Sequence, residues 1–273
     1  MTDEEVIFDM HRLTREVRFA INSEPDDQLA RRPSNSFAGY PSLTGLGHYF
    51  SLAVTLAGEL DPSSSYLLNI KQIDEAVRKR GVPLVRDAVV SRQFGGGGEV
   101  LRRLYDALHD AWPPRKLDEL SLALSPFLCL SLKQSELPMM RLSQKFEFSA
   151  SHRLHNPQLS DDENCRIFGK CNNPHGHGHN YVLQVTIRGK ADENGLLVEI
   201  PSFERIVAET VIDRVDHRNL NSEVPEFSEL IPSVENIARV IYGWLEPNLR
   251  NNRSELASVT VWETSKTWCE YAG

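Results

Sequence analysis

The 273-residue sequence lacks long apolar runs, an excess of positive charge and a secretory signal pattern. Its longest apolar candidate, around residues 120–132, is interrupted by Ser125 and Pro126 and falls short of the ~20 apolar residues of a membrane-spanning helix. The net charge of −8 argues against a nucleic-acid or membrane surface, because such surfaces need a concentrated positive patch. The first ten residues, MTDEEVIFDM, are acidic and carry no signal pattern.

Cysteine is also scarce, and its spacing suggests no disulfide framework. The four cysteines are Cys129, Cys165, Cys171 and Cys269. This usage fits a reducing compartment, so we expect a cytoplasmic protein. A hydrophobic content of 40% and a charged content of 25% are typical of a globular protein with a core. The length allows one large domain or two ordinary ones.

Histidines are concentrated between Phe146 and Tyr181. In a β-strand, alternate side chains point to the same face, roughly 7 Å apart. His177 and His179 in the triplet HGH therefore project together, and His152 has the same place on an earlier strand. Antiparallel pairing would bring three imidazoles together with a fourth position open, which is the arrangement of a catalytic zinc site.

Cys171 precedes the HGH triplet by six residues, counted to His177. The spacing leaves two roles open. The thiol is either the fourth ligand of a closed structural site or a reactive group held beside the metal, since nearby cations lower the pKa of a thiol. The turn-forming run 172–174 separates it from the strand, so its reach is not fixed by the sequence.

Five motifs follow one another from Phe146 to the C-terminus: SASHRL, FGKCNNP, GHGHNY, VDHRNL and VWET. In this order they resemble the family of 6-pyruvoyl-tetrahydropterin and 6-carboxytetrahydropterin synthases. The resemblance covers nearly half of the chain. It implies the T-fold architecture, a catalytic Zn²⁺ ion and 7,8-dihydroneopterin triphosphate as the substrate.

The resemblance also implies a role for each matched residue. The expected zinc ligands are His152, His177 and His179. The expected proton-transfer set is Cys171, Asp216 and His217. Because an imidazole titrates near neutrality, His217 oriented by Asp216 is a general acid–base candidate.

Two glutamates are the expected substrate contacts. Glu263 resembles the residue that anchors the pterin ring, and a carboxylate accepts two parallel N–H bonds from an amino-pyrimidine edge. Glu235 lies in the turn Pro232–Asn236, which replaces a threonine-rich turn that helps to hold the pterin in the family.

Taken alone, each of these residues has an ordinary structural explanation. A lone His152 is more often a core histidine bonded to backbone. Asp216 can cap a turn, and His217 can complement a helix C-terminus. Glu263 can be an exposed strand residue. The combination of motifs, and not any single residue, favours a catalytic role.

The first half of the chain is similar to the second. Gly47–Asp61 aligns with Gly178–Asp192 at an offset of 131 residues (179 − 48). Two amphipathic helices also correspond. Their apolar faces are Leu101, Leu104, Tyr105, Leu108 and Trp112, and Ile237, Val240, Ile241, Trp244 and Leu245. We therefore predict an α+β protein of two tandem T-fold domains, 1–138 and 139–273. Each is a four-stranded antiparallel sheet with two helices on one face, in the order β-β-α-α-β-β.

The first domain lacks most of the site. Its His48 aligns with His179. The counterparts of His177, Cys171 and Glu263 are Leu46, Tyr40 and Lys133. Because one histidine cannot hold a catalytic zinc, we predict that this domain is degenerate and has no catalytic site.

The resemblance implies rings of trimers stacked in pairs, which hide exposed sheet edges and place active sites at subunit interfaces. We expect a trimer-based homo-oligomer with a small pterin triphosphate as its ligand and no nucleic-acid or membrane partner. Two arrangements stay open: a degenerate ring stacked on an active one, or both domains alternating within mixed barrels.

The function favoured by the motifs is a zinc-dependent, pyruvoyl-forming lyase that releases triphosphate in tetrahydropterin biosynthesis. The alternative is 6-carboxy-5,6,7,8-tetrahydropterin synthase, acting on the same substrate in queuosine and deazapurine biosynthesis, where the cysteine usually lies nearer the HGH triplet. A third hypothesis is a non-catalytic pterin-binding or scaffold protein with a structural zinc closed by Cys171. His175 stands where the family usually carries Asn and adds a titratable group.

Overall fold

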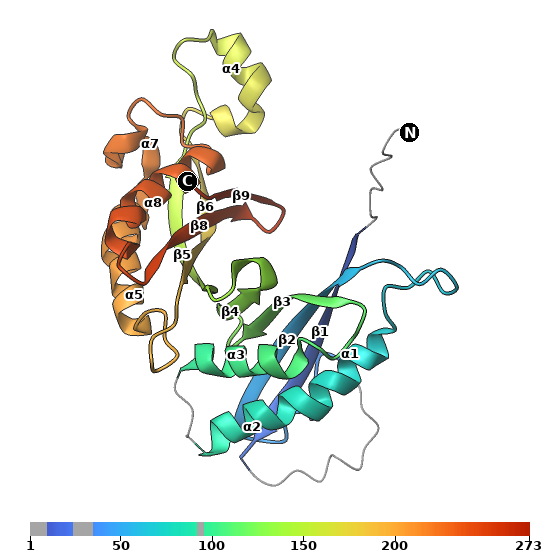
Figure 1. Ribbon diagram of the computed structural model, residues 1–273. Coiled ribbons are helices and arrows are strands. Elements are labelled where there is room, and N and C mark those ends of the chain that lie inside the picture. Colours follow the sequence, from blue (N-terminus) through green and yellow to red (C-terminus); the bar gives the residue numbers. More distant parts are fainter. Residues whose placement is uncertain (1–9, 24–34, 92–95) are drawn as a thin grey trace, which may run out of the picture. The chain divides into compact units, whose positions relative to one another are not determined.

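The computed structural model describes residues 10–23, 35–91 and 96–273, which form two compact units. Unit 1 contains the described residues up to Arg141 together with Lys190–Leu197; unit 2 contains Leu142–Gly189 and Val198–Gly273. Each unit combines helices with antiparallel strands (Figure 1). The predicted α+β class is therefore confirmed. None of the helices described is both long enough and apolar enough to cross a bilayer.

Unit 1 has four strands in the spatial order β1-β2-β3-β4, with antiparallel pairing throughout. They are β1 (His11–Asn22), β2 (Gly47–Gly58), β3 (Lys116–Ala123) and β4 (Leu128–Lys133). Alternate residues of β2 supply one side of the core: Phe50, Leu52, Val54 and Leu56. A slip of one residue in the pairing would turn these four side chains away from the core, so their burial fixes the register of β2 in the sheet.

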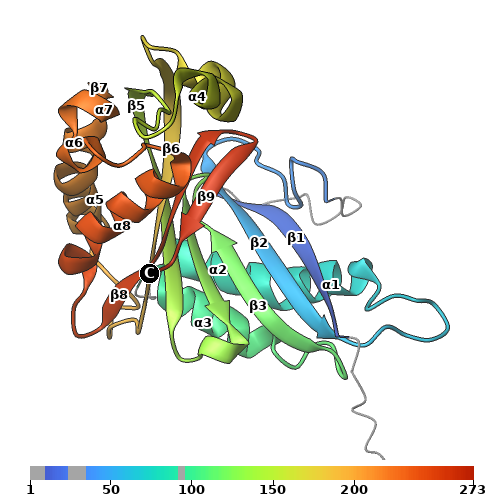
Figure 2. The same cartoon turned by 90° about the horizontal axis from the view of Figure 1, so that it is seen from above.

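The helices of unit 1 lie on one face of this sheet (Figure 2). They are α1 (Ile70–Ala76), the π-helical segment η2 (Val77–Gly81), α2 (Val82–Ser91) and α3 (Gly97–Leu108); a 3₁₀ turn, η3 (Gln134–Glu136), follows β4. The Asn69 side chain caps α1 by accepting from the backbone N–H of Lys71. The predicted apolar face of α3 and the following turn is confirmed, because all five residues named for it are buried.

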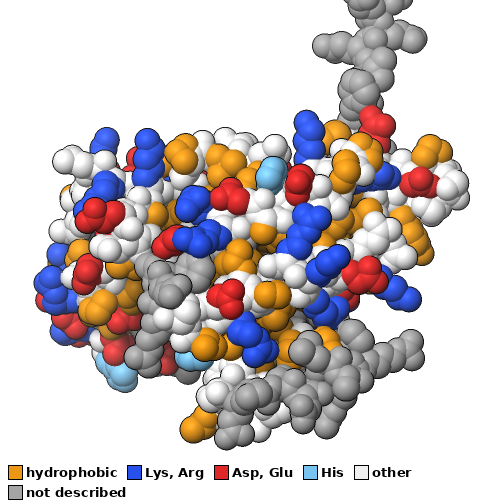
Figure 3. Space-filling view, turned by 60° about the horizontal axis from the view of Figure 1, so that its bottom comes forward, with side chains coloured by type: hydrophobic (Ala, Val, Ile, Leu, Met, Phe, Trp, Pro, Cys, Tyr) orange, Lys and Arg blue, Asp and Glu red, His pale blue; other side chains and the backbone are white. Residues whose placement is uncertain are grey.

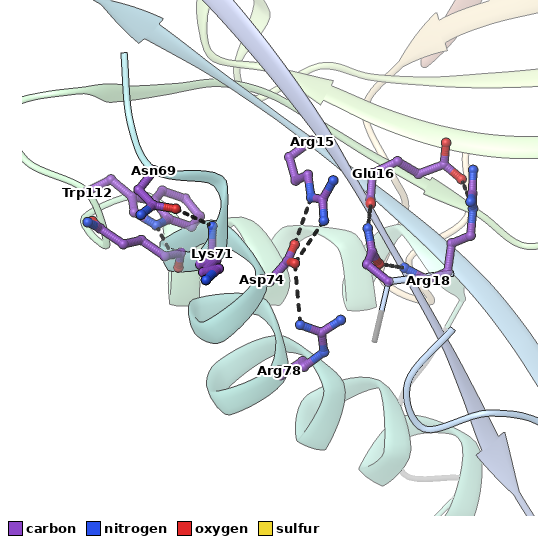
Figure 4. A network of polar contacts seen from close by, with 10 residues as sticks. Arg15, Glu16, Arg18, Asn69, Lys71, Asp74, Arg78 and Trp112 are labelled. Carbon is purple, nitrogen blue, oxygen red and sulfur yellow. Dashed lines mark hydrogen bonds and ion pairs between the residues drawn. The ribbon is translucent and has the colours of Figure 1, made fainter. Parts of the chain in front are cut away.

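A network of charged groups joins β1 to α1 and η2 in unit 1 (Figure 4). Arg15 donates from Nε and Nη2 to the two carboxylate oxygens of Asp74, each at 2.9 Å. Arg78 Nη1 lies 3.6 Å from Asp74 Oδ2. The Asp74 side chain is only 13% exposed, so its charge depends on the two guanidinium groups.

We expect Asp74→Ala to lower the free energy of unfolding by about 3 kcal/mol, because removing one partner of a buried pair leaves the other charges uncompensated. Urea denaturation followed by circular dichroism measures the change. The matched control is Asp106→Ala, since Asp106 pairs with Arg102 where both side chains are about 60% exposed. Its expected cost is below about 1 kcal/mol. Equal costs for the two variants would contradict the role given to the network.

Unit 2 is built on β5 (Met140–His152), β6 (His177–Gly189), β8 (Ser254–Thr264) and β9 (Thr267–Tyr271), which are neighbours in that order. A two-residue strand, β7 (Arg218–Asn219), pairs in parallel with β5 at Ala150 and Ser151. Along β5 and β6 every second residue is buried, which places the metal-ligand candidates and the core residues Phe148, Ala150, Tyr181 and Leu183 on one face.

The helical segments of unit 2 are α4 (Asp161–Phe168), η4 (Gly169–Asn172), α5 (Ile200–Val207), η5 (Ala208–Ile212), α6 (Asp213–Val215), α7 (Leu220–Glu223), η6 (Pro225–Phe227) and α8 (Val234–Leu249). Ser160 and Glu163 form a capping box at the start of α4, which projects beyond the ends of β5 and β6 (Figure 1). Along α8, Ile237, Ile241 and Leu245 are buried as predicted. Val240 and Trp244 are only half-buried, and the Trp244 indole donates to Glu226 at 2.8 Å.

The two units share local irregularities at matching positions. A register shift interrupts the pairing of β2 with β3 between Thr55 and Leu56, and that of β6 with β8 between Thr186 and Ile187. Each unit also has a five-residue π-helical segment, η2 in one and η5 in the other. Both features recur after 131 residues (186 − 55 and 208 − 77).

One predicted correspondence is wrong. Lys133 ends β4, the fourth strand of unit 1, whereas Glu263 lies on β8, the third strand of the main path in unit 2. The two residues therefore have no equivalent place in the sheets.

Charged side chains of both signs are interspersed on the face drawn in Figure 3, over the residues described there. The ion pairs of unit 1 include Arg12–Asp118, Arg80–Asp110 and Arg102–Asp106. Such a mixture is typical of a solvated surface.

Candidate active site and metal centre

The strand alternation predicted for the histidines brings His152, His177 and His179 together at one end of β5 and β6. A fourth residue, Glu263 of β8, joins them. One ligand atom from each residue lies within 4.8 Å of the others, and no second group of this kind occurs among the described residues. Gly176 precedes β6 with φ +72°, and a Cβ there would approach the His152 carbonyl oxygen to 3.0 Å. Glycine at this position lets the two strands approach each other.

The surroundings of His152 fix its tautomer. The ring is fully buried, and its Nδ1 lies 2.7 Å from the carbonyl oxygen of Pro232, to which it donates. The lone pair is therefore on Nε2, which faces His177 Nε2 at 3.1 Å and Glu263 Oε1 at 3.1 Å. A histidine held by a backbone carbonyl through its other nitrogen is the usual arrangement of a metal ligand.

The other polar atoms of this group are also arranged as expected around a bound cation. His179 Nε2 lies 3.3 Å from Glu263 Oε1, but without hydrogen-bond geometry. Within the described residues, His177 Nδ1 is also buried with no hydrogen-bond partner. Burial lowers the pKa of His152 and of His179, so both rings are held as neutral imidazoles with a free lone pair. Three imidazoles and a carboxylate are a ligand set that suits zinc.

Two residues that the sequence did not indicate support this group. The Tyr181 ring is fully buried, and its hydroxyl lies 3.4 Å from His152 Nε2. Burial, followed by the charges of Glu263 and Cys171, raises the pKa of Tyr181 far above its usual value, so it stays a neutral phenol. Pro232 contributes through its backbone only. Neither contact has a sequence signal, because both depend on long-range packing.

Cys171 is not part of this group, but its charge acts on Tyr181, whose hydroxyl lies 3.4 Å from His152 Nε2. It is half-buried in η4, and its carbonyl oxygen accepts from Leu154 N at 2.9 Å, which ties η4 to the end of β5. The ligand group consists of the three histidines and Glu263, without the thiol. Of the two roles left open by spacing, the geometry therefore favours a thiol near the metal over a fourth ligand.

Asp216 and His217 form a hydrogen-bonded pair at the β5 edge. His217 Nδ1 lies 2.8 Å from Asp216 Oδ2, and Asp216 Oδ1 accepts from Ser149 N at 2.8 Å. These two hydrogen bonds, the backbone one first, lower the pKa of Asp216. His217 has φ +55°, an uncommon backbone conformation for a residue other than glycine, and its own N–H donates to Ser149 O at 2.6 Å.

The His217 ring lines a cavity that also reaches one of the ligand candidates, His179. This cavity has a volume of about 550 Å³, and its walls include Ser149, Ser151, Gly178 and Asn180. These residues alternate with the buried residues of β5 and β6, so they belong to the opposite face of the sheet from His152. The His217 side chain is 82% exposed. His217 and one member of the ligand group, His179, therefore line the same cavity of a single chain.

Glu235 lies in the exposed first turn of α8, after the cap residue Ser233. It is not in the ligand group, and its charge lies near Cys269 of β9: burial first, and then the charge of Glu235, raises the pKa of that thiol. Asn236 Nδ2 donates to Ile231 O at 2.9 Å, which stabilises the turn that carries Pro232. The predicted substrate contact thus has no partner that identifies its role.

Comparison with known proteins places this site in a family. The model of the family described as 6-pyruvoyl tetrahydropterin synthase matches residues 141–273. The 6-pyruvoyl tetrahydrobiopterin synthase of Drosophila melanogaster is 40% identical over 141 residues, covering 51% of this chain and 83% of the relative. The chain belongs to the 6-pyruvoyl tetrahydropterin synthase family. This is a family of lyases, so the protein is an enzyme.

Further relatives match the same half. The human 6-pyruvoyl tetrahydrobiopterin synthase is 39% identical over 134 residues, covering 49% of this chain and 91% of the relative. The 6-carboxy-5,6,7,8-tetrahydropterin synthase of Haemophilus influenzae is 26% identical over 154 residues, covering 49% and 99%. The solved structure of the Caenorhabditis elegans 6-pyruvoyl tetrahydropterin synthase aligns with a TM-score of 0.47 and 38% identity, covering 50% of this chain and 96% of that one.

Proposed function

We propose that the protein is a zinc-dependent lyase that converts 7,8-dihydroneopterin triphosphate to 6-pyruvoyl-tetrahydropterin and releases triphosphate. The observation that carries this proposal is the group of His152, His177, His179 and Glu263 with Cys171 beside it. The Drosophila and human relatives, which are named 6-pyruvoyl tetrahydrobiopterin synthases, are 40% and 39% identical, against 26% for the Haemophilus carboxypterin enzyme.

The three histidines are the proposed zinc ligands. When bound, zinc lowers the pKa of a substrate hydroxyl and stabilises negative charge that develops on its oxygen. Cys171 is proposed to take a proton from the adjacent carbon, and its half-buried place beside the cluster limits competition from water. His217 is proposed to return a proton, with Asp216 fixing the ring through Nδ1 so that Nε2 faces outward.

The reaction itself tests the proposal. Zinc-loaded protein incubated with 7,8-dihydroneopterin triphosphate should yield a pyruvoyl pterin and free triphosphate by mass spectrometry. A carboxypterin with acetaldehyde would instead establish the alternative activity on the same substrate. Bound zinc without any turnover would support a non-catalytic pterin-binding protein.

Glu263 is proposed to bind the amino-pyrimidine edge of the pterin, although its carboxylate contacts two imidazoles in the ligand-free arrangement. We expect Glu263→Gln to keep its zinc and to raise KM by about 10–100-fold, the effect of losing a charge-assisted hydrogen bond. Zinc content and steady-state kinetics measure the two effects. Glu255→Gln, on the same strand, is the control. Loss of zinc from the Glu263 variant would make this residue a ligand and exclude the pterin role.

The proposed site is shared between copies of the chain, in a trimer-based homo-oligomer. The support is that the His217 side chain is 82% exposed and is not in the ligand group, so its ring is accessible to the cluster of another copy. Mixing Cys171→Ala with His217→Ala subunits is expected to restore turnover that neither variant has alone. Co-expression with two affinity tags isolates the mixed oligomer. Absence of any recovery in that oligomer would place both residues in the site of one chain.

Unit 1 is proposed to be a degenerate copy of the catalytic unit, with the boundary near residues 138–139. The shared register shift and π-helical segment, both displaced by 131 residues, support this proposal. Among the described residues, the group of side chains that could hold a metal ion lies in unit 2, so His48 has no companion ligands there. The proposed role of unit 1 is in assembly of the oligomer.

A further inference from the structure

A second cavity lies next to the proposed metal centre within unit 2. It has a volume of about 420 Å³, in the range of small-molecule sites. Its lining includes Arg153, Gly176 and Ile231. These residues are the immediate sequence neighbours of His152, His177 and Pro232, so the cavity wall is continuous along the chain with two of the ligands, although none of those three residues lines it. Nothing in the roles proposed above uses this space.

Arg153 is held rigidly in the wall of the cavity. Its Nε donates to the backbone oxygen of Asn172 at 3.0 Å and to Asn172 Oδ1 at 3.2 Å. The Asn221 side chain bridges the backbone of Arg153, accepting from N at 2.7 Å and donating to O at 3.0 Å. Across residues 10–23, 35–91 and 96–273, neither Nη nitrogen of Arg153 has a hydrogen-bond partner. The guanidinium group is therefore held in place through Nε, while its two Nη groups are available to a ligand.

Asn172 is the residue that organises this wall. It is buried, and its Oδ1 also receives His155 Nδ1 at 3.0 Å. Asn172 is the immediate neighbour of Cys171, so the segment that presents the thiol also orients Arg153. His175 completes the lining with an exposed ring, and its backbone N–H donates to Asn173 Oδ1 at 3.0 Å.

The hydrogen-bond donors of the lining suit an anion with several oxygens, although the formal charges of Arg153 and Glu229 cancel. Arg153 is always protonated, and a guanidinium fork matches phosphate geometry with two parallel N–H bonds. The imidazole at position 175 contributes a further N–H donor. Glu229 is the single carboxylate in the lining; it is exposed at the rim and opposes an anion.

We propose that this cavity binds the triphosphate group of the substrate, with Arg153 as its cation, His175 as a second donor, and Asn172 and Asn221 as positioning residues. This inference rests on the proposed function, because it assigns the leaving group of that reaction to a place beside the metal centre. It also gives His175, where the family usually carries Asn, a specific role in holding phosphate.

Inorganic triphosphate tests the site without requiring turnover. Calorimetric titration of the zinc-loaded full chain should show a Kd that weakens by about 10–100-fold in Arg153→Gln and by about 2–5-fold in His175→Asn. Glu229→Gln should tighten binding, because it removes the opposing charge. Arg239→Gln is the matched control, since Arg239 is exposed on α8 and outside the lining. Any extraction of zinc by the probe affects the control equally.

Arg153→Lys separates a folding defect from loss of the site, because it keeps the charge and removes the fork; an intermediate Kd is expected. Binding of 7,8-dihydroneopterin without phosphates should be the same in all variants. Unchanged triphosphate affinity in Arg153→Gln and Glu229→Gln would overturn the proposal even if the enzyme turns over. Arg153-dependent binding in a protein without turnover would support the anion site and reject only the proposed reaction.

Discussion

Turnover of 7,8-dihydroneopterin triphosphate by the zinc-loaded Cys171→Ala protein is expected to fall by about 10²–10⁴-fold, the range caused by loss of a positioned proton-transfer group. Zinc content is expected to stay at the wild-type level, because the ligand group contains no thiol. The fold should also persist, since η4 is tied to β5 through the backbone of Cys171 and not through its side chain. Single-turnover kinetics and metal analysis of the same preparation measure both effects.

The control for this variant is Cys165→Ala, the same substitution at an exposed cysteine in α4. It should retain turnover. If Cys171→Ala instead lost zinc and stability together, the thiol would be a ligand of a structural site, and the scaffold hypothesis would replace the enzyme. If it kept both zinc and turnover, another group would have to supply the base. The experiment therefore separates the two roles that the spacing of Cys171 left open.

The convergence of the three histidines could be predicted because it depends on a local rule. Alternation along a strand fixes which residues share a face, and the apolar residues that follow His179 identify the buried one. The structure confirms this pattern, since Tyr181, Leu183 and Val185 are all fully buried. The α+β class follows from similar local patterns.

The partners of these histidines could not be predicted in the same way. Pro232 contacts His152 across 80 residues of sequence, through a backbone atom that carries no side-chain signal. Glu263 comes from β8, and sequence motifs suggested a pterin contact without indicating that its carboxylate reaches two imidazoles. Such contacts depend on long-range packing, which leaves no periodic pattern in the sequence.

The misplacement of Lys133 has a different physical cause. Strand β3 contains Lys116, Asp118 and Glu119 among its apolar residues, so its alternation is weaker than that of β4. The sequence of β4 is the more apolar of the two, but β3 is the strand that pairs with β2 as β8 pairs with β6. By its pairing partner, β3 therefore takes the place in unit 1 that β8 takes in unit 2.

Removal of one metal ligand should have the largest effect of all. We expect His177→Ala to weaken zinc binding by more than about 10²-fold, because even outer-shell partners contribute 10–100-fold to metal affinity. Activity should fall to background, and adding zinc should not restore it. His177 is preferable to His152 for this test, since His152 is fully buried and its loss would also create a cavity.

The matched control is His48→Ala in unit 1, which makes the same substitution at the residue aligned with His179. If unit 1 has no metal site, the variant keeps one zinc per chain and full turnover after chelation and reloading. Half the zinc of the wild type in His48→Ala would instead show a second site and reject the degenerate unit. Full zinc content in His177→Ala would show that the metal is held elsewhere. That result would reject the catalytic role proposed for the whole cluster. Because the two substitutions are identical in chemistry, any difference between them measures the presence of companion ligands, which only unit 2 supplies among the described residues.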